Sequence, residues 1–183
     1  MSARFSLAID LGTSNSAIAI ADLESGETRI IEIAQTLGPN QIGEMPTLPS
    51  AVYIPHSEEF TESSFPLPWN EAGERTIIGQ FARERGALVP DRVATSAKSW
   101  LSNPHVDPKQ RILPWGSDIA EEKLSPFECS RLYLQHLRDA FLHSERAQGR
   151  DCDLSEGEIV VTVPASFDEV ARSLTAEAAK AAG

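Results

Sequence analysis

Apolar and polar positions alternate at the start of the chain. From residue 5 to residue 10 every second side chain is large and apolar, which predicts a strand with one buried face. Further apolar runs predict strands at 17–21, 28–33 and 50–54. Because the first three runs are joined by short turns, we expect neighbouring strands to be antiparallel.

The second half of the chain shows a helical period. Residues Ser125–Glu128 match a capping box, with Pro126 at the first helical position, and predict a helix that begins there. Apolar side chains then fall on one face of this helix: Tyr133, Leu134, Leu137, Ala140 and Phe141. We expect Gly149 to end the helix, because glycine adopts the left-handed backbone that follows many helices.

Shorter segments predict the remaining elements. A short strand is expected at 75–78 and a short helix at 80–88. The run at 158–163 is rich in valine, which predicts a strand in the centre of its sheet. Residues Ser166–Glu169 match a second capping box, with the serine as the cap of an alanine-rich helix.

The composition narrows the classes of partner. The chain has 183 residues and a net charge of -11, so its surface repels phosphate backbones and anionic lipid headgroups. We therefore expect no nucleic acid and no membrane among its partners, and no run approaches the roughly 20 apolar residues of a membrane span. Cys129 and Cys152 lie far apart and no signal peptide is evident, which predicts reduced thiols in a cytoplasmic protein.

The turn between the first two strands carries candidate chemistry. Gly12 lets the backbone approach another group closely, and successive N–H groups with the hydroxyls of Thr13 and Ser14 can bind phosphate oxygens. Asp10 favours phosphate only when a cation such as Mg²⁺ lies between them. The same residues also occur in ordinary hairpin turns, so the turn alone leaves both interpretations open. A P-loop is excluded, because no Gly-Lys-Ser/Thr follows.

Four segments resemble the 70 kDa heat-shock chaperones (DnaK type) of the actin-like ATPase superfamily. The first is IDLGTSNSAIAI at 9–20, which is similar to the family's first phosphate motif. The second is VTVPASFDEVARSLTAEAAKAAG at 161–183. TLPSAVYI at 47–54 is a third, and IGQFARE at 78–84 followed by TSAKSWL at 95–101 is a weaker fourth. Because all four occur in the family's order across nearly the whole chain, together they are specific.

The resemblance implies a site for ATP or ADP with Mg²⁺. Asp10 corresponds to the acid that organises Mg²⁺ through its waters, and Gly12, Thr13 and Ser14 correspond to the loop that holds the β- and γ-phosphates. Lys98 corresponds to the lysine that positions the attacking water and offsets γ-phosphate charge. Without the resemblance, this lysine reads as a solvated charge on a short helix.

The resemblance also implies an allosteric relay and shows departures from the family. Pro164 and Arg172 correspond to the pair that relays the nucleotide state to the substrate domain, although a strand end and an exposed charge explain them equally well. Ser166 stands where the family has an aromatic residue, which puts the usual coupling in doubt. Residues 56–75, rich in Glu, Ser and Pro, are expected to be an inserted surface excursion.

The implied fold is one ribonuclease-H-like lobe of the α/β class. We expect a mixed sheet led by antiparallel hairpins, with flanking helices, formed by 1–35 and 125–183. Residues 36–124 should form a smaller, irregular α/β subdomain. The second lobe and a substrate-binding domain are expected to lie outside these 183 residues.

The implied function is part of the ATP-binding motor of a DnaK-type chaperone. Its partners would be unfolded client proteins and co-chaperones. Because one lobe supplies donors on only one side of the phosphates, we expect the fragment alone to bind ATP weakly or not at all and not to hydrolyse it. The alternatives are a lobe of a small-molecule kinase of the same superfamily and an actin-like filament protein.

Overall fold

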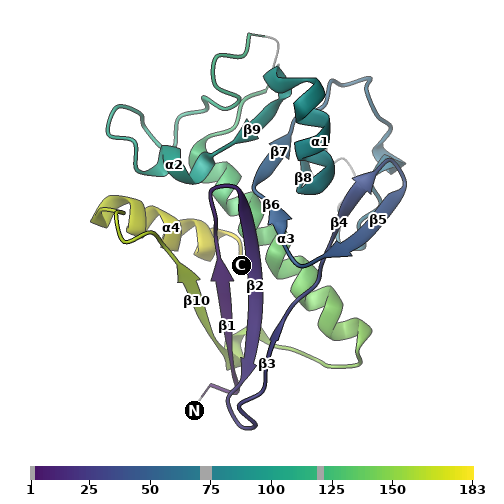
Figure 1. Cartoon of the computed structure of the whole chain (residues 1–183), viewed down its shortest axis with the longest axis vertical. Coiled ribbons are helices and arrows are strands. Elements are labelled where there is room, and N and C mark those ends of the chain that lie inside the picture. The colour runs from purple at the N-terminus through teal and green to yellow at the C-terminus, as the bar shows by residue number, and fades with distance from the viewer. Residues whose placement is uncertain (1–2, 71–75, 119–121) are drawn as a thin grey trace.

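The computed structural model describes residues 3–70, 76–118 and 122–183. Its main sheet has five strands, of which four lie in the order β10-β1-β2-β3 and the fifth, β6, pairs with β2. The four strands of the row are β1 (Phe5–Asp10), β2 (Asn15–Asp22), β3 (Thr28–Ile30) and β10 (Gly157–Thr162). β1, β2 and β3 are antiparallel neighbours, whereas β10 runs parallel to β1. The predicted mixed sheet with leading antiparallel hairpins is therefore confirmed (Figure 1).

Residues 33–101 form a second group of small elements above this sheet (Figure 1). A hairpin and a three-stranded sheet in the order β8-β7-β9 make up most of it. The elements are β4 (Ile33–Gly38), β5 (Gln41–Met45), β6 (Leu48–Pro49), β7 (Ala51–Tyr53), β8 (Ile77–Ile78), α1 (Gln80–Leu88), β9 (Val93–Thr95) and α2 (Ala97–Leu101). Single-turn 3₁₀ helices lie at Glu62–Ser64, Pro90–Arg92 and Leu154–Glu156. β6 also pairs with β2, so the two groups are joined next to the first turn.

The long helix α3 (Pro126–Ala147) begins as the sequence predicts. The Ser125 hydroxyl accepts from the backbone N–H of Glu128 at 3.0 Å, and the Glu128 carboxylate accepts from the N–H of Ser125 at 2.7 Å. Gly149 follows the helix end with a φ of 72°, as expected of a glycine that ends a helix. The apolar face of α3 packs on the main sheet, where Tyr133, Leu137 and Phe141 are fully buried.

The helix α4 (Glu169–Ala181) is capped by a residue other than the predicted one. The Asp168 carboxylate accepts from the backbone N–H of Ala171 at 2.8 Å, so Asp168 is the N-cap. The prediction that Ser166 caps this helix is wrong, because the helix begins too late for its side chain to reach the first turn. Ser166 is instead exposed in the loop between β10 and α4.

Two strand predictions need correction. The run predicted as one strand at 28–33 is split, because β3 ends at Ile30 and the chain pairs with β5 from Ile33 onward. Between them, Ile31 still donates to the backbone oxygen of Ile18 in β2 at 3.0 Å. The valine-rich strand β10 was expected at the centre of its sheet, but in the described part of the chain it pairs only with β1 and forms the edge. Ile159 and Val160 are accordingly 44% and 42% exposed. A valine-rich run indicates that a strand lies in an apolar environment, but it does not show whether neighbouring strands pair with one edge of it or with both.

The excursion at 56–75 is built around aromatic side chains in its described part. Phe60 and Phe65 meet edge to face at 4.9 Å between ring centroids. Both rings contact Phe81 of α1, at 5.9 and 5.6 Å. These residues pack on a second, smaller core beneath β7. The described part of the excursion is therefore anchored to α1, and residues 71–75, with part of the strand predicted at 75–78, lie outside the described residues.

Candidate functional site

The turn between β1 and β2 places the predicted phosphate loop at the tip of the hairpin. Thr13 and Ser14 are exposed there, and the chain reverses direction over residues 11–14. A Cβ added at Gly12 would lie 1.8 Å from the backbone oxygen of Asn15. Because no real Cβ approaches a backbone atom so closely, only glycine fits this turn.

Asp10 ends β1 beside the last residue of β10. The two strands are parallel and in register, so Asp10 lies opposite Thr162. The Thr162 hydroxyl donates to the Asp10 carboxylate at 2.7 Å. Thr162 carries no signal in the sequence beyond its place in a strand, and only the strand register shows that it orients this carboxylate.

Lys98 is the second residue of α2. Figure 1 shows α2 near the tip of the β1–β2 hairpin. Its side chain is buried, with 7% of the residue exposed, so the interpretation as a solvated lysine does not hold. Burial lowers the pKa of Lys98, and the nearby negative charge of Asp10 opposes that shift. Among the described residues no carboxylate lies within ion-pair distance of this ammonium. Among the described residues, Lys98 is therefore a buried cation that lies near the Asp10 carboxylate without forming a direct ion pair.

The loop between β10 and α4 forms the other wall beside Lys98. The Lys98 ammonium lies 5.9 Å from the centre of the Phe167 ring, at the outer limit for a cation–π contact. The Arg172 guanidinium donates to the backbone oxygen of Phe167 at 3.0 Å and to that of Ala165 at 3.4 Å. Arg172 therefore fixes the loop that begins at Pro164 and carries Phe167 to Lys98.

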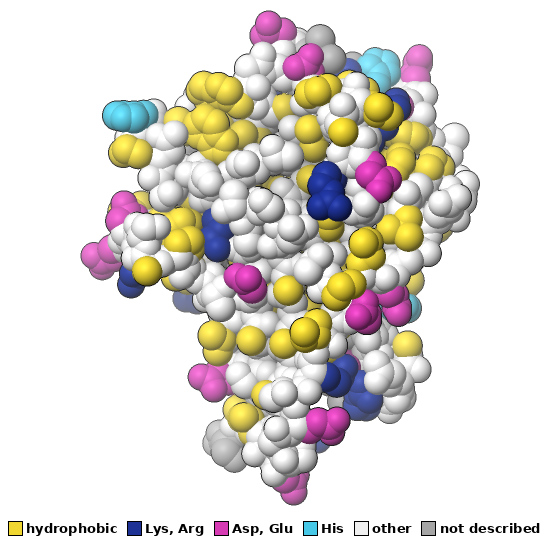
Figure 2. Space-filling view, viewed as in Figure 1, with side chains coloured by type: hydrophobic (Ala, Val, Ile, Leu, Met, Phe, Trp, Pro, Cys, Tyr) yellow, Lys and Arg dark blue, Asp and Glu magenta, His cyan; other side chains and the backbone are white. Residues whose placement is uncertain are grey.

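The fold brings most of the predicted residues to one place. Asp10, the turn, Lys98 and the loop after Pro164 meet where the hairpin tip approaches α2 and α4 (Figure 1). Figure 2 shows this face as mostly uncharged, with separate basic and acidic side chains. Phosphates with a metal ion suit such a face, because the phosphates can lie beside basic side chains and the metal ion beside an acidic one.

The donor set fits Mg²⁺ held through water. Asp10 is a single carboxylate among hydroxyls and backbone groups, and in the described part of the chain no cluster of three His, Cys, Asp or Glu side chains could hold a metal directly. Mg²⁺ keeps several waters and binds through one or two carboxylates and phosphate oxygens. Asp10 would therefore hold Mg²⁺ at this turn.

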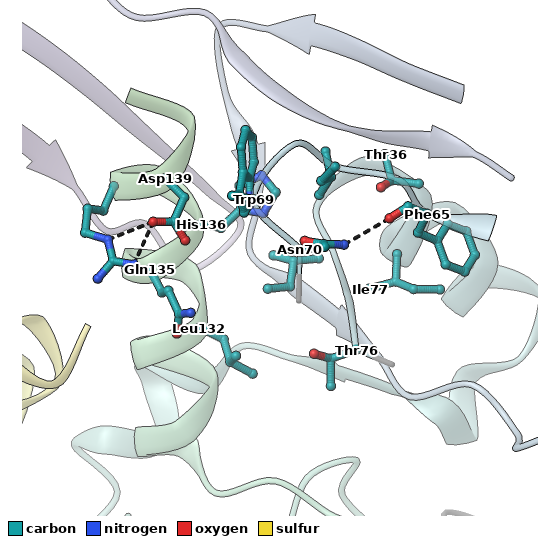
Figure 3. Close-up of a pocket in the computed structure, with 13 residues that line it drawn as sticks. Thr36, Phe65, Trp69, Asn70, Thr76, Ile77, Leu132, Gln135, His136 and Asp139 are labelled. Carbon is teal, nitrogen blue, oxygen red and sulfur yellow. Dashed lines mark hydrogen bonds and ion pairs between the residues drawn. The ribbon is translucent and has the colours of Figure 1, made fainter. Parts of the chain in front are cut away.

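A separate cavity of about 410 Å³ is lined by residues of the excursion and of α3 (Figure 3). Trp69 and Asn70 line it from the excursion, and His136 and Asp139 line it from α3. Asn70 donates to the backbone oxygen of Phe65 at 3.0 Å, which fixes the loop at its entrance. None of the predicted site residues lines this cavity. No helix in the described residues is long and apolar enough to cross a membrane.

Comparison with known families agrees with this geometry. The model of the Hsp70 protein family matches residues 6–183, which is nearly the whole chain. The match covers the hairpin, α2 and the loop between β10 and α4, so all the residues gathered at the candidate site fall inside it. The mixed α/β structure agrees with a lobe of the actin-like ATPase fold. The chain belongs to the Hsp70 family.

Proposed function

We propose that this chain is the first lobe of the ATP-binding motor of a DnaK-type chaperone and holds Mg²⁺ and nucleotide at the β1–β2 turn. One observation carries the proposal. Lys98 and Asp10 are 88 positions apart in sequence, yet the fold sets the buried ammonium close to this carboxylate and to the turn. Burying a cation that forms no direct ion pair is unfavourable unless a ligand supplies the anion. A nucleotide phosphate beside the turn supplies it.

Each residue then has one task. The N–H groups of the turn and the hydroxyls of Thr13 and Ser14 bind the β- and γ-phosphates, while Lys98 offsets the γ-phosphate charge and orients the attacking water. The bound Mg²⁺ would neutralise developing charge on the phosphate oxygens. Asp10 holds the waters of that ion, and Thr162 keeps the carboxylate in place through its 2.7 Å hydrogen bond. Positioning and charge are what phosphoryl transfer needs most.

The proposal also covers the allosteric relay, the partners of the protein and its cellular compartment. Arg172 fixes the Phe167 segment, so a displacement of Lys98 on nucleotide exchange reaches the loop after Pro164. This loop is the proposed route to a substrate-binding domain, unfolded clients and co-chaperones. The exposed Ser166 replaces the family's aromatic residue there and weakens that coupling. Two free cysteines suit a reducing compartment such as the cytoplasm.

Lys98→Met should weaken nucleotide binding and stabilise the fold. Losing one charge-assisted contact with phosphate costs about 1.5 kcal/mol, which is roughly tenfold in the Kd for Mg·ATP. Methionine fills similar space without a buried charge, so the free energy of unfolding should rise by about 1 kcal/mol. NMR titration with Mg·ATP and urea unfolding measure the two effects.

Lys109→Met is the matched control. The Lys109 ammonium lies 5.1 Å from the Phe127 ring but donates to the Glu177 carboxylate at 2.6 Å and is exposed. This variant should leave the Kd unchanged. If Lys98→Met lowers stability and leaves the Kd unchanged, Lys98 is a structural residue and the proposed function loses its main support.

A further inference from the structure

The turn between β1 and β2, here called the phosphate turn, is fixed by hydrogen bonds from one buried serine of the TLPS segment. Ser50 lies between β6 and β7 and is 4% exposed. Its hydroxyl donates to the backbone oxygen of Gly12 at 2.8 Å, and its own N–H donates to the backbone oxygen of Ser14 at 2.9 Å. The fully buried Ser16 hydroxyl lies 3.0 Å from the Ser50 hydroxyl. One residue therefore fixes two carbonyls of the turn, those of Gly12 and Ser14.

The direction of these carbonyls decides where the turn's donors point. In a trans peptide the C=O and the N–H of the same unit point in opposite directions. Because the Gly12 carbonyl faces Ser50, the N–H of Thr13 faces away from it, on the exposed side of the turn. The Ser14 carbonyl also faces Ser50, so the N–H of Asn15 points away in the same manner. A turn whose carbonyls are held inward presents N–H groups for an anion.

We propose that Ser50 is a positioning residue that orients the peptide units of the phosphate turn. Without its hydroxyl, the Gly12–Thr13 peptide unit can rotate and present a carbonyl oxygen, which repels phosphate. Because Ser50 lies between β6 and β7, the same hydrogen bonds tie the turn to residues 33–101, which carry Lys98. The inference rests on the proposed function for its effect on nucleotide, but the orientation of the turn is independent of it.

Ser50→Ala should weaken binding of Mg·ATP by about tenfold, because one well-placed donor of the turn is lost. It should also loosen the turn without nucleotide: the backbone order parameter of Thr13 should fall from about 0.85 to below about 0.6. Ser50→Thr keeps the hydroxyl and should restore both values. The measurements are an NMR titration with Mg·ATP and ¹⁵N relaxation of the nucleotide-free chain.

Ser130→Ala is the matched control. Ser130 is 1% exposed and its hydroxyl donates to the Pro126 carbonyl at 2.9 Å, inside α3 and away from the turn. Both alanine variants should lose similar stability, but only Ser50→Ala should change Thr13 and the Kd. If the two variants have the same Thr13 order parameter, the inference is wrong. If Ser50→Ala loosens Thr13 but leaves the Kd for Mg·ATP unchanged, phosphate does not use this turn, so the proposed function fails and the positioning role stands.

Discussion

Gly12→Ala is expected to abolish detectable nucleotide binding while the protein remains folded. The added Cβ would lie 1.8 Å from the backbone oxygen of Asn15, so the turn must open. The neighbour is backbone, which cannot swing aside as a flexible side chain does. Opening the turn removes at least two N–H contacts to phosphate, which is about 3 kcal/mol and more than 100-fold in the Kd.

Gly38→Ala provides the comparison for this variant. The Cβ added at Gly38 meets only the end of the Gln41 side chain, at 3.3 Å, and that side chain can move. NMR titration with Mg·ATP should therefore show unaltered binding for Gly38→Ala and none for Gly12→Ala. Far-UV circular dichroism checks that both variants are folded. Equal binding by Gly12→Ala and the unaltered chain would mean that phosphate does not use this turn.

The second large effect is a loss of stability in acid that originates at His136. This side chain is buried in α3, and its Nε2–H donates to the backbone oxygen of Ala34 at 3.0 Å. The edge of Trp69 packs on the ring at 5.5 Å between centroids. Burial lowers the pKa of His136 to about 4, and the hydrogen bond to Ala34 offsets only part of that shift. The folded protein therefore keeps this imidazole neutral at neutral pH.

The sign of the pH dependence follows from comparison with the unfolded chain. An unfolded histidine has a pKa of about 6.5, so it binds a proton as the pH falls below that value while the folded form does not. The contribution of the neutral His136 to the free energy of unfolding is complete above pH 6.5 and is lost as the pH falls towards about 4. A difference of about 2.5 pKa units corresponds to about 3 kcal/mol.

Urea unfolding at several pH values between about 7 and 4 measures this loss. His136→Gln should remove most of it, because an amide can donate to Ala34 but does not titrate in this range. His143→Gln is the matched control on the same helix, since His143 also contacts Trp69, at 5.6 Å, but is only partly buried. An unchanged pH slope in His136→Gln would show that the buried imidazole is not the source.

Local signals account for the parts of the fold that the sequence predicts correctly. The capping box at Ser125 and the apolar period after it locate α3, because both act within a few residues of one another. The cap of α4 was placed two residues early, because the serine and the following aspartate both suit an N-cap and only the helix start distinguishes them. The position of β10 at the edge depends on which strands pair, and a valine-rich run does not report that.

In the candidate site, too, the sequence indicates some features, whereas others depend on tertiary structure. The residue types of the turn alone allow either phosphate binding or an ordinary hairpin turn, and the family match, which covers them, favours phosphate binding. The supporting contacts depend on tertiary structure: Thr162 reaches Asp10 through strand register, and Ser50 reaches Gly12 across 38 positions. The burial of Lys98 is also invisible in the sequence, because it comes from tertiary packing that brings distant segments, among them the loop of Phe167, beside this side chain.

The most direct test of the account is a titration of the ¹⁵N-labelled chain with Mg·ATP. We expect weak binding, with a Kd of about 1 mM or above, so the titration should extend to about 10 mM. The account predicts that the amide signals of Gly12, Thr13 and Ser14 shift together, accompanied by signals around Lys98, and that ATP without Mg²⁺ shifts them less. Two results would contradict the account. One is that the turn signals stay unchanged up to the highest Mg·ATP concentration, and the other is that shifts are confined to the cavity around Trp69 and His136.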